Sequence, residues 1–514
     1  MRKLIFAASA TALAVAVASC QPEKTVQSVG QVFDPSPVGM VEDTEGQIAD
    51  TFGLKGRDYS AYRAKLPREQ TLIMLNEKGQ LESDRMQNYV NSVMRKIARA
   101  AETRLGVTNF QPIVTVSAQH SVNAFTSPAG AVVVTRGMIQ TLENEDQLAF
   151  ILGHEAAHVL LDHHDNDWVV KSQRHSLTTA EMGMSALAAL GEATGKAGLG
   201  GELQKYRLIA SGALILSRDV LMPRFSQKNE SEADLLGIDL MVVAGYSPRA
   251  ANSVGKFLGR METGADDPAS ISAEREFADW WEVNKESSGI FSEMLTEIEA
   301  EFKKARSESR NKYADAKERQ AAIGMYARRE YRKIRSDLQA RRYKAALNER
   351  RTRTVLQQYD KAANAYKLIS ESKLKKARRD AARSARGVTA SHSYPLIILS
   401  EAELADGDER NAIRSLQRAI RGKNPALQTY MTLGQLQAEN GNLGSAVKTV
   451  AAGRKRFGQA APIMIQNIAL LVRAKRKTQA LALSAECKLT FPELEKECQD
   501  ALKGTFGQKQ KAGA

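Results

Sequence analysis

The stretch GHEAAHVLLDHH, residues 153–164, holds four of the seven histidines in this chain of 514 residues. His154 and His158 are four positions apart, so on a helix both imidazoles leave the same face and can bind one tetrahedral metal ion. Glu155 falls beside them, where its carboxylate can hold a water, take a proton as that water attacks a carbonyl, and pass it to the leaving amine. The pattern predicts metal-assisted hydrolysis, because a merely solvated helix would leave the neighbouring apolar residues unexplained.

A catalytic zinc site usually needs a third protein ligand and one open position. Residues 225–248, FSQKNESEADLLGIDLMVVAGYSP, predict a helix that Ser226 caps and that ends near Gly245. On this helix Glu230 and Asp234 share a face, so one carboxylate can ligate and the other can orient a ligand histidine. Two acids on a helix more often mark a solvated face, and the residues alone leave both alternatives open.

The elements that position these groups can be predicted from periodicity. FQPIVTVSA (110–118) and GAVVVTRG (130–137) favour strands, and VNAFTSPAG (122–130) between them has the composition of a turn. An extended substrate is expected to pair with the strand edge formed by Val132, Val133 and Val134.

Two helices are predicted around these strands. Residues 83–105 place apolar side chains at helical spacing. A second helix should begin at Asn144, with Gln147 completing the cap, and should carry the histidine pair.

Three blocks, taken in order, resemble one metallopeptidase family. VNAFTSPAGAVVVTRGM, NEDQLAFILGHEAAHVLLDHH and FSQKNESEADLLGIDLMVVAGYSP are similar to motifs of the HtpX-like and CAAX-prenyl-protease-like gluzincins, and most similar to their soluble periplasmic branch. The resemblance covers residues 45–265 and implies one Zn2+ per chain. It also implies that His154, His158 and Glu230 are the ligands, that Glu155 is the general base and that Asp234 orients a ligand.

Three other positions bear on this resemblance. The family's spacing favours Glu230 over Glu232 as the third ligand. His163 lies off the ligand face and is interpreted as a packing residue or a charge at the helix end. Relatives often carry a His-Pro pair downstream, yet no histidine lies between His175 and His392. A basic or phenolic donor could stabilise the oxyanion in its place.

The N-terminus has the layout of a secretory signal, with Arg2 and Lys3, an apolar run, and small residues that lead directly into Cys20. Val17-Ala18-Ser19-Cys20 resembles a lipobox, so residues 1–19 are expected to be removed and Cys20 to be acylated. The acyl chains would tether the protein to a membrane, and Gln21 favours the outer membrane because it is not the retaining aspartate. A linker over 20–45 is expected to follow, and an ordinary cleaved signal is the alternative.

A peptidase domain over 46–265 is followed by a strongly basic section. Residues 301–390 carry 27 Lys and Arg against 10 Asp and Glu, with almost no proline or glycine, which predicts a basic helical arm over 266–390. Export argues against nucleic acid as its partner and favours acidic lipid headgroups or an acidic protein. A solvated arm whose charge serves solubility is an equal alternative.

The C-terminal section repeats with a period of 34 residues, as in Ala412, Ala446 and Ala480, and again in Ala419, Gly453 and Cys487. This predicts a tetratricopeptide-like α-solenoid over 391–500, whose concave face would bind protein, and a flexible tail over 501–514. An unspecialised helical bundle is the alternative. Cys487 and Cys498 are equally consistent with a disulfide and with two small buried residues.

The sequence therefore predicts a mainly α chain with a small β-sheet, in which a zincin-type metallopeptidase domain precedes a basic helical segment and the solenoid. The expected function is a lipid-anchored zinc endopeptidase of the periplasm that hydrolyses misfolded or stalled envelope proteins and meets the outer-membrane assembly machinery through its repeats. A non-proteolytic chaperone or assembly scaffold with a latent metal site is the alternative. The intact Glu155 favours the enzyme, and the missing downstream histidine favours latency.

Overall fold

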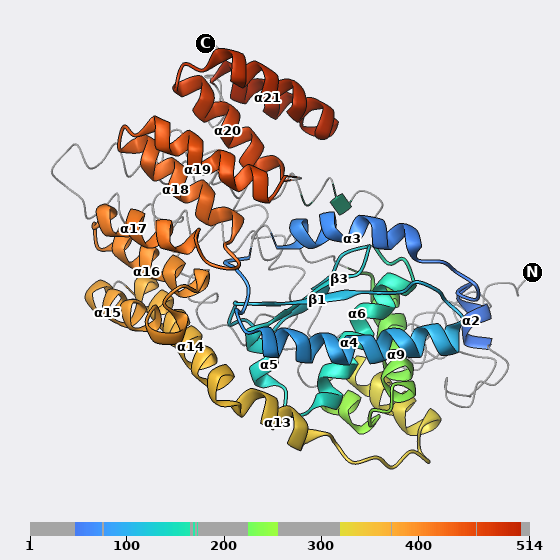
Figure 1. Ribbon diagram of the computed structural model, residues 1–514. Coiled ribbons are helices and arrows are strands. Elements are labelled where there is room, and N and C mark those ends of the chain that lie inside the picture. The colour runs from blue at the N-terminus through green and yellow to red at the C-terminus, as the bar shows by residue number, and fades with distance from the viewer. Residues whose placement is uncertain are drawn as a thin grey trace, which may run out of the picture.

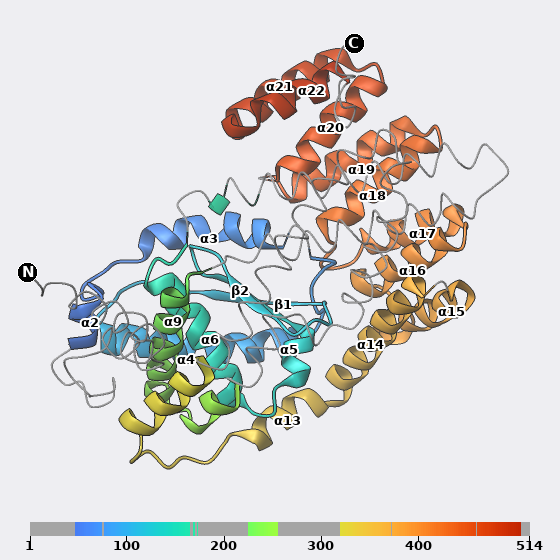
Figure 2. The same cartoon turned by 180° about the vertical axis from the view of Figure 1, so that it is seen from behind.

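The computed structural model describes residues 47–74, 77–164, 168–169, 172, 225–254, 319–371, 373–458 and 460–504. The predicted signal peptide, Cys20 and the linker lie outside the described residues. A three-stranded sheet with helices on both faces forms one part of the molecule, and stacked helical pairs extend from it (Figures 1 and 2). The prediction of a mainly helical chain with a small sheet is confirmed. Within the ranges given above, no helix is long and apolar enough to cross a membrane.

The first half of the fold follows the predicted order of elements. Ser83 caps α4 by accepting a hydrogen bond from the Met86 N–H, and Gly106 ends this helix with φ of 66°. The elements of this part are α2 (Gln47–Thr51), α3 (Ser60–Ile73), α4 (Asp84–Leu105), β1 (Ile113–Ser117), β2 (Ala124–Thr126), β3 (Ala131–Thr135), α5 (Arg136–Thr141), α6 (Glu145–Leu160) and α9 (Gln227–Val243).

The strand order is β1-β3-β2, so β3 is the central strand. It pairs in parallel with β1, with Val132 opposite Val114, and antiparallel with β2, with Val133 opposite Phe125. Val132 and Val134 belong to the core that includes α4 and α6, whereas Val133 packs with residues of α3. The prediction that Val132, Val133 and Val134 form a free edge for substrate is therefore wrong. Their uninterrupted apolar run marks a strand that is buried on both faces.

The segment that was expected to be a turn contributes a strand. β2 lies inside VNAFTSPAG, and the chain reverses only over residues 127–130, where the Gly130 N–H donates to the Ser127 carbonyl at 3.0 Å. Gly130 has φ of 87°, which favours glycine. β2 has three residues, too few for an alternating pattern to outweigh the proline and glycine that follow it.

The outer edge of β1 is closed by side chains of α4. The Asn91 amide accepts from the Val114 N–H at 3.0 Å and donates to the Val114 carbonyl at 2.8 Å. The side-chain amide oxygen of Gln87 accepts from the Val116 N–H at 3.0 Å. Since these backbone groups are already paired, this edge cannot accept an added strand.

Residues 319–369 pack on the peptidase domain and do not project from it as an arm. Tyr326 and Tyr331, which follow Arg319 in the chain, both donate to the buried Asp239 carboxylate of α9. Tyr343 of α13 (Ala340–Asn348) donates to the Ile139 carbonyl. The prediction of a separate basic arm over 266–390 is wrong for this segment. Most of its charged side chains are exposed, apart from the buried Arg319 and Glu330, and Tyr326, Tyr331 and Tyr343 are buried on its inner face.

The remaining helices stack in antiparallel pairs (Figure 1). The first helices of three pairs begin at residues 393, 427 and 461 and the second helices at 409, 443 and 477, so both series advance by 34 residues. A further pair, α14 and α15, packs on α16, so the stack begins before the predicted boundary at 391. These helices are α14 (Arg350–Ser370), α15 (Leu374–Ser384), α16 (Ser393–Ala405), α17 (Glu409–Ala419), α18 (Leu427–Glu439), α19 (Leu443–Arg456), α20 (Ala461–Arg473) and α21 (Lys477–Thr490).

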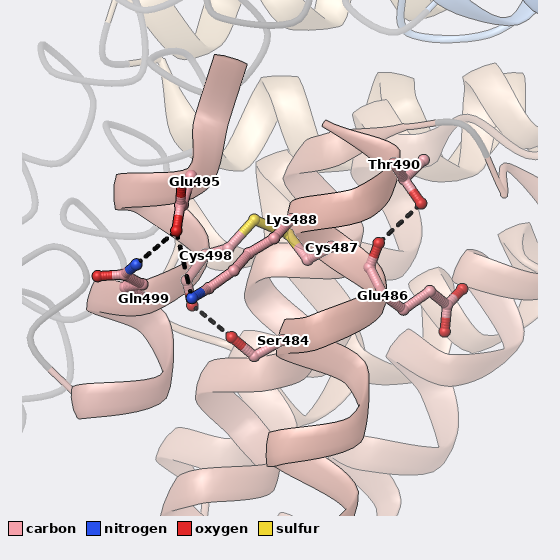
Figure 3. Close-up of a disulfide and its surroundings, with 8 residues drawn as sticks. All are labelled: Ser484, Glu486, Cys487, Lys488, Thr490, Glu495, Cys498 and Gln499. Atoms are coloured by element: carbon pink, nitrogen blue, oxygen red, sulfur yellow. Dashed lines mark hydrogen bonds and ion pairs between the residues drawn. A yellow bond between two sulfur atoms is a disulfide. The ribbon is translucent and has the colours of Figure 1, made fainter. Parts of the chain in front are cut away.

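A disulfide fastens the last helix of the stack (Figure 3). Cys487 of α21 is bonded to Cys498 of α22 (Glu495–Lys503), and both side chains are fully buried. Ser484 donates to the Cys498 carbonyl at 3.2 Å, and Lys488 pairs with Glu495 at 3.4 Å. Of the two alternatives for these cysteines, the structure contains the bonded one. α22 also continues past residue 501, where the flexible tail was expected to begin.

Candidate metal centre

Helices α6 and α9 pack against each other beside β2, so closely that their backbones are in contact (Figure 2). Gly153 and Gly237 lie at the contact, where a Cβ on Gly237 would be 2.8 Å from the backbone nitrogen of His154. This approach brings the carboxylates of α9 within reach of the imidazoles of α6. Ala233 of α9 is buried as well, but it is the glycine pair that allows the backbones to touch.

The N-terminus of α6 is held by a buried carboxylate. Glu145 accepts hydrogen bonds from Tyr89 at 2.7 Å, from Tyr246 at 2.8 Å and from Lys96 at 3.1 Å. Burial alone would raise the pKa of Glu145, but these three donors outweigh it and lower the pKa below 4.5. As predicted, Asn144 caps the helix by accepting from the Gln147 N–H at 2.9 Å.

The three predicted ligands converge at this crossing. The Nε2 atoms of His154 and His158 are 3.0 Å apart. The Glu230 carboxylate lies 3.6 Å from His154 Nε2 and 3.8 Å from His158 Nε2. One possible ligand atom from each residue lies within 4.8 Å of the other two. The ring of Phe225 stacks on His158 with 3.8 Å between ring centroids.

This arrangement fits a divalent cation. Two imidazole nitrogens 3.0 Å apart repel each other unless a proton or a metal ion lies between them. Burial lowers the pKa of His154, but the charges of Asp234 and Glu230 outweigh it and raise the pKa above 6.5. The same negative charge favours a metal ion in place of the proton. Two histidines and one carboxylate are a donor set typical of catalytic zinc.

Asp234 and Arg319 form a second layer behind the ligands. Asp234 Oδ1 lies 3.0 Å from His154 Nδ1, as expected for a residue that orients the ligand. Arg319 donates to both oxygens of Asp234, at 2.9 and 3.0 Å, and its Nη2 lies 2.9 Å from Glu230 Oε2. Sequence reasoning missed Arg319, because nothing local marks a residue so far along the chain from Glu230.

His163 lies behind the other ligand histidine. Its Nδ1 is 2.9 Å from His158 Nδ1, and its Nε2 is 3.3 Å from Glu232 Oε2. Burial lowers the pKa of His163 to about 4, so its imidazole is neutral near pH 7. The interpretation of His163 as a charge at the helix end is therefore wrong. Glu232, the competing candidate for the third ligand, contacts His163 and not the ligand cluster.

Glu155 lies on the same helix as the two histidines and is buried, with 6% of its surface exposed. Burial is the largest influence on the pKa of Glu155. The charge of His154 opposes it and that of Glu230 reinforces it, and the pKa rises to about 7. A carboxylate with a pKa near neutrality can both take and return a proton, which is what a general base at this position requires.

β2 is an outer strand of the sheet next to these groups, and its three residues are buried. The Thr135 N–H donates to the Asn123 carbonyl and the Ser127 N–H to the Ala131 carbonyl, so the backbone groups of Ala124 and Thr126 point outward. The Thr126 carbonyl accepts from His164 Nε2 at 2.9 Å. Among the described residues, the outward N–H groups of Ala124 and Thr126 have no hydrogen-bond partner.

Comparison with known proteins agrees with this geometry. The sequence model of peptidase family M48 matches residues 84–294, a range that includes all three candidate ligands and Glu155. The chain carries a peptidase family M48 domain. The match takes in β1 to β3, α6 and α9, so it includes the outer strand β2 as well as the ligand cluster.

Three relatives illustrate the similarity. Mitochondrial metalloendopeptidase OMA1 of Schizosaccharomyces pombe is 27% identical over 40% of this chain and 57% of its own length. The β-barrel assembly-enhancing protease of Escherichia coli is 28% identical over 32% of this chain and 30% of its own. Metalloprotease LoiP of Escherichia coli is 27% identical over 45% of this chain and 87% of its own. The chain thus spans less than two thirds of the length of the first two relatives.

Proposed function

We propose that this chain is a zinc-dependent endopeptidase of the bacterial cell envelope that cleaves misfolded or stalled envelope proteins. One observation carries the proposal. A buried carboxylate with a raised pKa, Glu155, lies on the same helix as two histidines whose nitrogens meet the carboxylate of Glu230. A site that only bound metal would have no need for this base. Membership of a metallopeptidase family supports the same conclusion.

In the proposed reaction His154, His158 and Glu230 would hold the ion. A bound zinc ion would polarise the scissile carbonyl and make a water molecule more acidic. Glu155 takes the proton of that water as the carbon–oxygen bond forms, then delivers it to the nitrogen of the leaving amine as the carbon–nitrogen bond breaks. Asp234 keeps the ring of His154 in place throughout.

The substrate is proposed to pair with the outer edge of β2. Extended peptides bind proteins by adding a strand to an open edge, which requires unpaired backbone donors and acceptors. The outward N–H groups of Ala124 and Thr126 have no partner among the described residues, whereas Asn91 and Gln87 close the edge of β1. A substrate strand would have to displace His164 from the Thr126 carbonyl. β2 also packs against α6, so a strand added there passes beside the ligands.

We also propose that lipid at Cys20 anchors the protein to the outer membrane from the periplasmic side. The helical pairs with a period of 34 residues would form a tetratricopeptide-like solenoid that recruits clients or the assembly machinery. Similarity to a relative that is named for β-barrel assembly supports a role in outer-membrane quality control.

A non-proteolytic chaperone or scaffold with a latent metal site is the second candidate. The observation that favours it is the 2.9 Å contact between Arg319 Nη2 and Glu230 Oε2, which places a cation on the third ligand. In that case a zinc ion would compete with the Arg319 guanidinium for Glu230 and would therefore bind weakly.

Zinc content and casein cleavage, measured on the same preparations, separate the two candidates. Glu155→Gln should keep one zinc per chain and lose cleavage, because an amide accepts the water's hydrogen bond but cannot take its proton. Glu230→Ala should lose zinc itself. Glu143→Gln, an exposed site just before α6, is the matched control and should behave as wild type. Wild-type cleavage by Glu155→Gln, or wild-type protein that contains zinc and cleaves nothing, would refute the peptidase.

A further inference from the structure

We propose that His163 and Glu232 form a hydrogen-bonded chain that positions the ligand His158 and fixes which of its nitrogens faces the metal. His163 Nδ1 lies 2.9 Å from His158 Nδ1, and His163 Nε2 lies 3.3 Å from Glu232 Oε2. Both are positioning residues, because neither belongs to the group of side chains that could hold the metal. The inference rests on the proposed zinc site and adds two residues to it.

The position of each group determines which atom donates and which accepts in these hydrogen bonds. His158 Nε2 faces His154 Nε2 and Glu230, so it must keep its lone pair for a metal ion. The proton of neutral His158 then lies on Nδ1, which donates to His163 Nδ1. His163 in turn carries its proton on Nε2 and donates it to Glu232.

The carboxylate at the far end makes this direction the favoured one. An ionised carboxylate can only accept, so Glu232 cannot donate to His163 and reverse the chain. A reversed chain would put a proton on His158 Nε2 and block the metal position. The side chains of His163 and Glu232 are 5% and 12% exposed, so little water competes for these hydrogen bonds.

The chain gives a role to each of three acidic residues near the start of α9. Glu230 meets the two Nε2 atoms, Asp234 lies 3.0 Å from Nδ1 of His154, and Glu232 acts on His158 through His163. Each ligand histidine therefore has its own carboxylate. Such partners hold the ring orientation and make the imidazole a better donor to the metal.

Zinc affinity tests the chain without reference to cleavage. His163→Leu and Glu232→Ala should each raise the zinc Kd about 10- to 100-fold, the usual effect of losing such a partner. The Kd is measured on the full-length protein by competition with a chromophoric chelator. Circular dichroism checks that each variant is folded, and the visible spectrum of the Co2+-substituted protein should change because the His158 ring is free to rotate.

Two matched variants separate positioning from general damage. Glu232→Gln keeps an oxygen that can accept from His163 but adds an amide that can donate to it, so its Kd should lie between those of wild type and Glu232→Ala. Lys228→Ala removes only the 3.7 Å ion pair with the other Glu232 oxygen and should leave the Kd unchanged. The proposed positioning of His158 would be refuted if His163→Leu and Glu232→Ala bound zinc with wild-type affinity. It would also be refuted if Glu232→Gln bound zinc no more tightly than Glu232→Ala. A wild-type protein that binds zinc but cleaves nothing would refute the peptidase function without refuting the roles of His163 and Glu232.

Discussion

Replacing Arg319 with alanine should strongly destabilise the peptidase domain. The Arg319 guanidinium makes two hydrogen bonds to Asp234, at 2.9 and 3.0 Å, and one 2.9 Å ion pair to Glu230. The side chains of Arg319 and Asp234 are 8% and 2% exposed, so water cannot replace the lost contacts. Burial raises the pKa of Asp234, and the charge of Arg319 is the largest of the influences that lower it overall. Without Arg319, Asp234 would remain a buried charge beside His154 alone.

The expected size of the effect follows from this burial. Deleting one partner of a buried ion pair costs about 3–5 kcal/mol, which for a domain of this size lowers Tm by roughly 6–20 °C. Arg319→Lys should lose less, because a compact ammonium group can still pair with one carboxylate but not with both in a fork. Differential scanning calorimetry of the metal-free full-length protein measures both shifts.

Arg328→Ala is the matched control for this experiment. It removes a cation from the same helix, residues 319–330, but its side chain is exposed, so the change in the free energy of unfolding should stay within about 1 kcal/mol. If Arg319→Ala and Arg328→Ala melt at the same temperature, Arg319 does not hold the two carboxylates in solution. The second layer of the site would then have to be reassigned.

Two other predictions concern stability. Because the pKa of Glu145 is below 4.5 in the folded protein, its contribution is present above pH 4.5 and is lost as the pH falls further; Glu145→Gln should lower Tm at pH 7, and the difference from wild type should shrink towards pH 3. Equal Tm values at pH 7 would contradict this. The disulfide closes a short loop, with a separation of 11 residues between Cys487 and Cys498, so the double alanine variant should lose about 2–4 kcal/mol of local stability. Faster hydrogen exchange in α22 than in oxidised wild type would reveal that loss, and unchanged exchange would argue against it.

The parts of the site that lie on single helices could be predicted from the sequence. Asn144 and Ser226 cap α6 and α9 as their residue types suggest, and helical spacing brings His154 and His158 to one face. The 34-residue period of small residues likewise matches the spacing of the helix starts. In each case the signal lies within one element or repeats at a fixed interval, so no knowledge of the tertiary fold is needed.

The parts that depend on contacts between distant segments could not be predicted. Composition predicted a basic helical arm that either meets an acidic partner or is solvated, yet Tyr326 and Tyr331 donate to the buried Asp239. A count of charges does not reveal which face of a helix is buried. The apolar run in β3 gave no indication of which strand would be central. That choice depends on β2, which is too short to leave a pattern.

The assembly of the site depends on contacts between segments distant in the sequence more than on the histidine motif itself. α6 supplies two imidazoles and the base, but all three carboxylates behind or beside them come from α9, and Arg319 holds two of these from a third segment. Helical residues 319–330 and the following Tyr331 also hold Asp239 of α9, through hydrogen bonds from Tyr326 and Tyr331. Since the hydrogen bonds of Arg319 and those of the tyrosines fix the same helix, α9 cannot move towards or away from the ligands unless residues 319–331 move with it. Metal binding should therefore protect residues 319–331 from exchange as strongly as it protects α9, although that segment contributes no ligand.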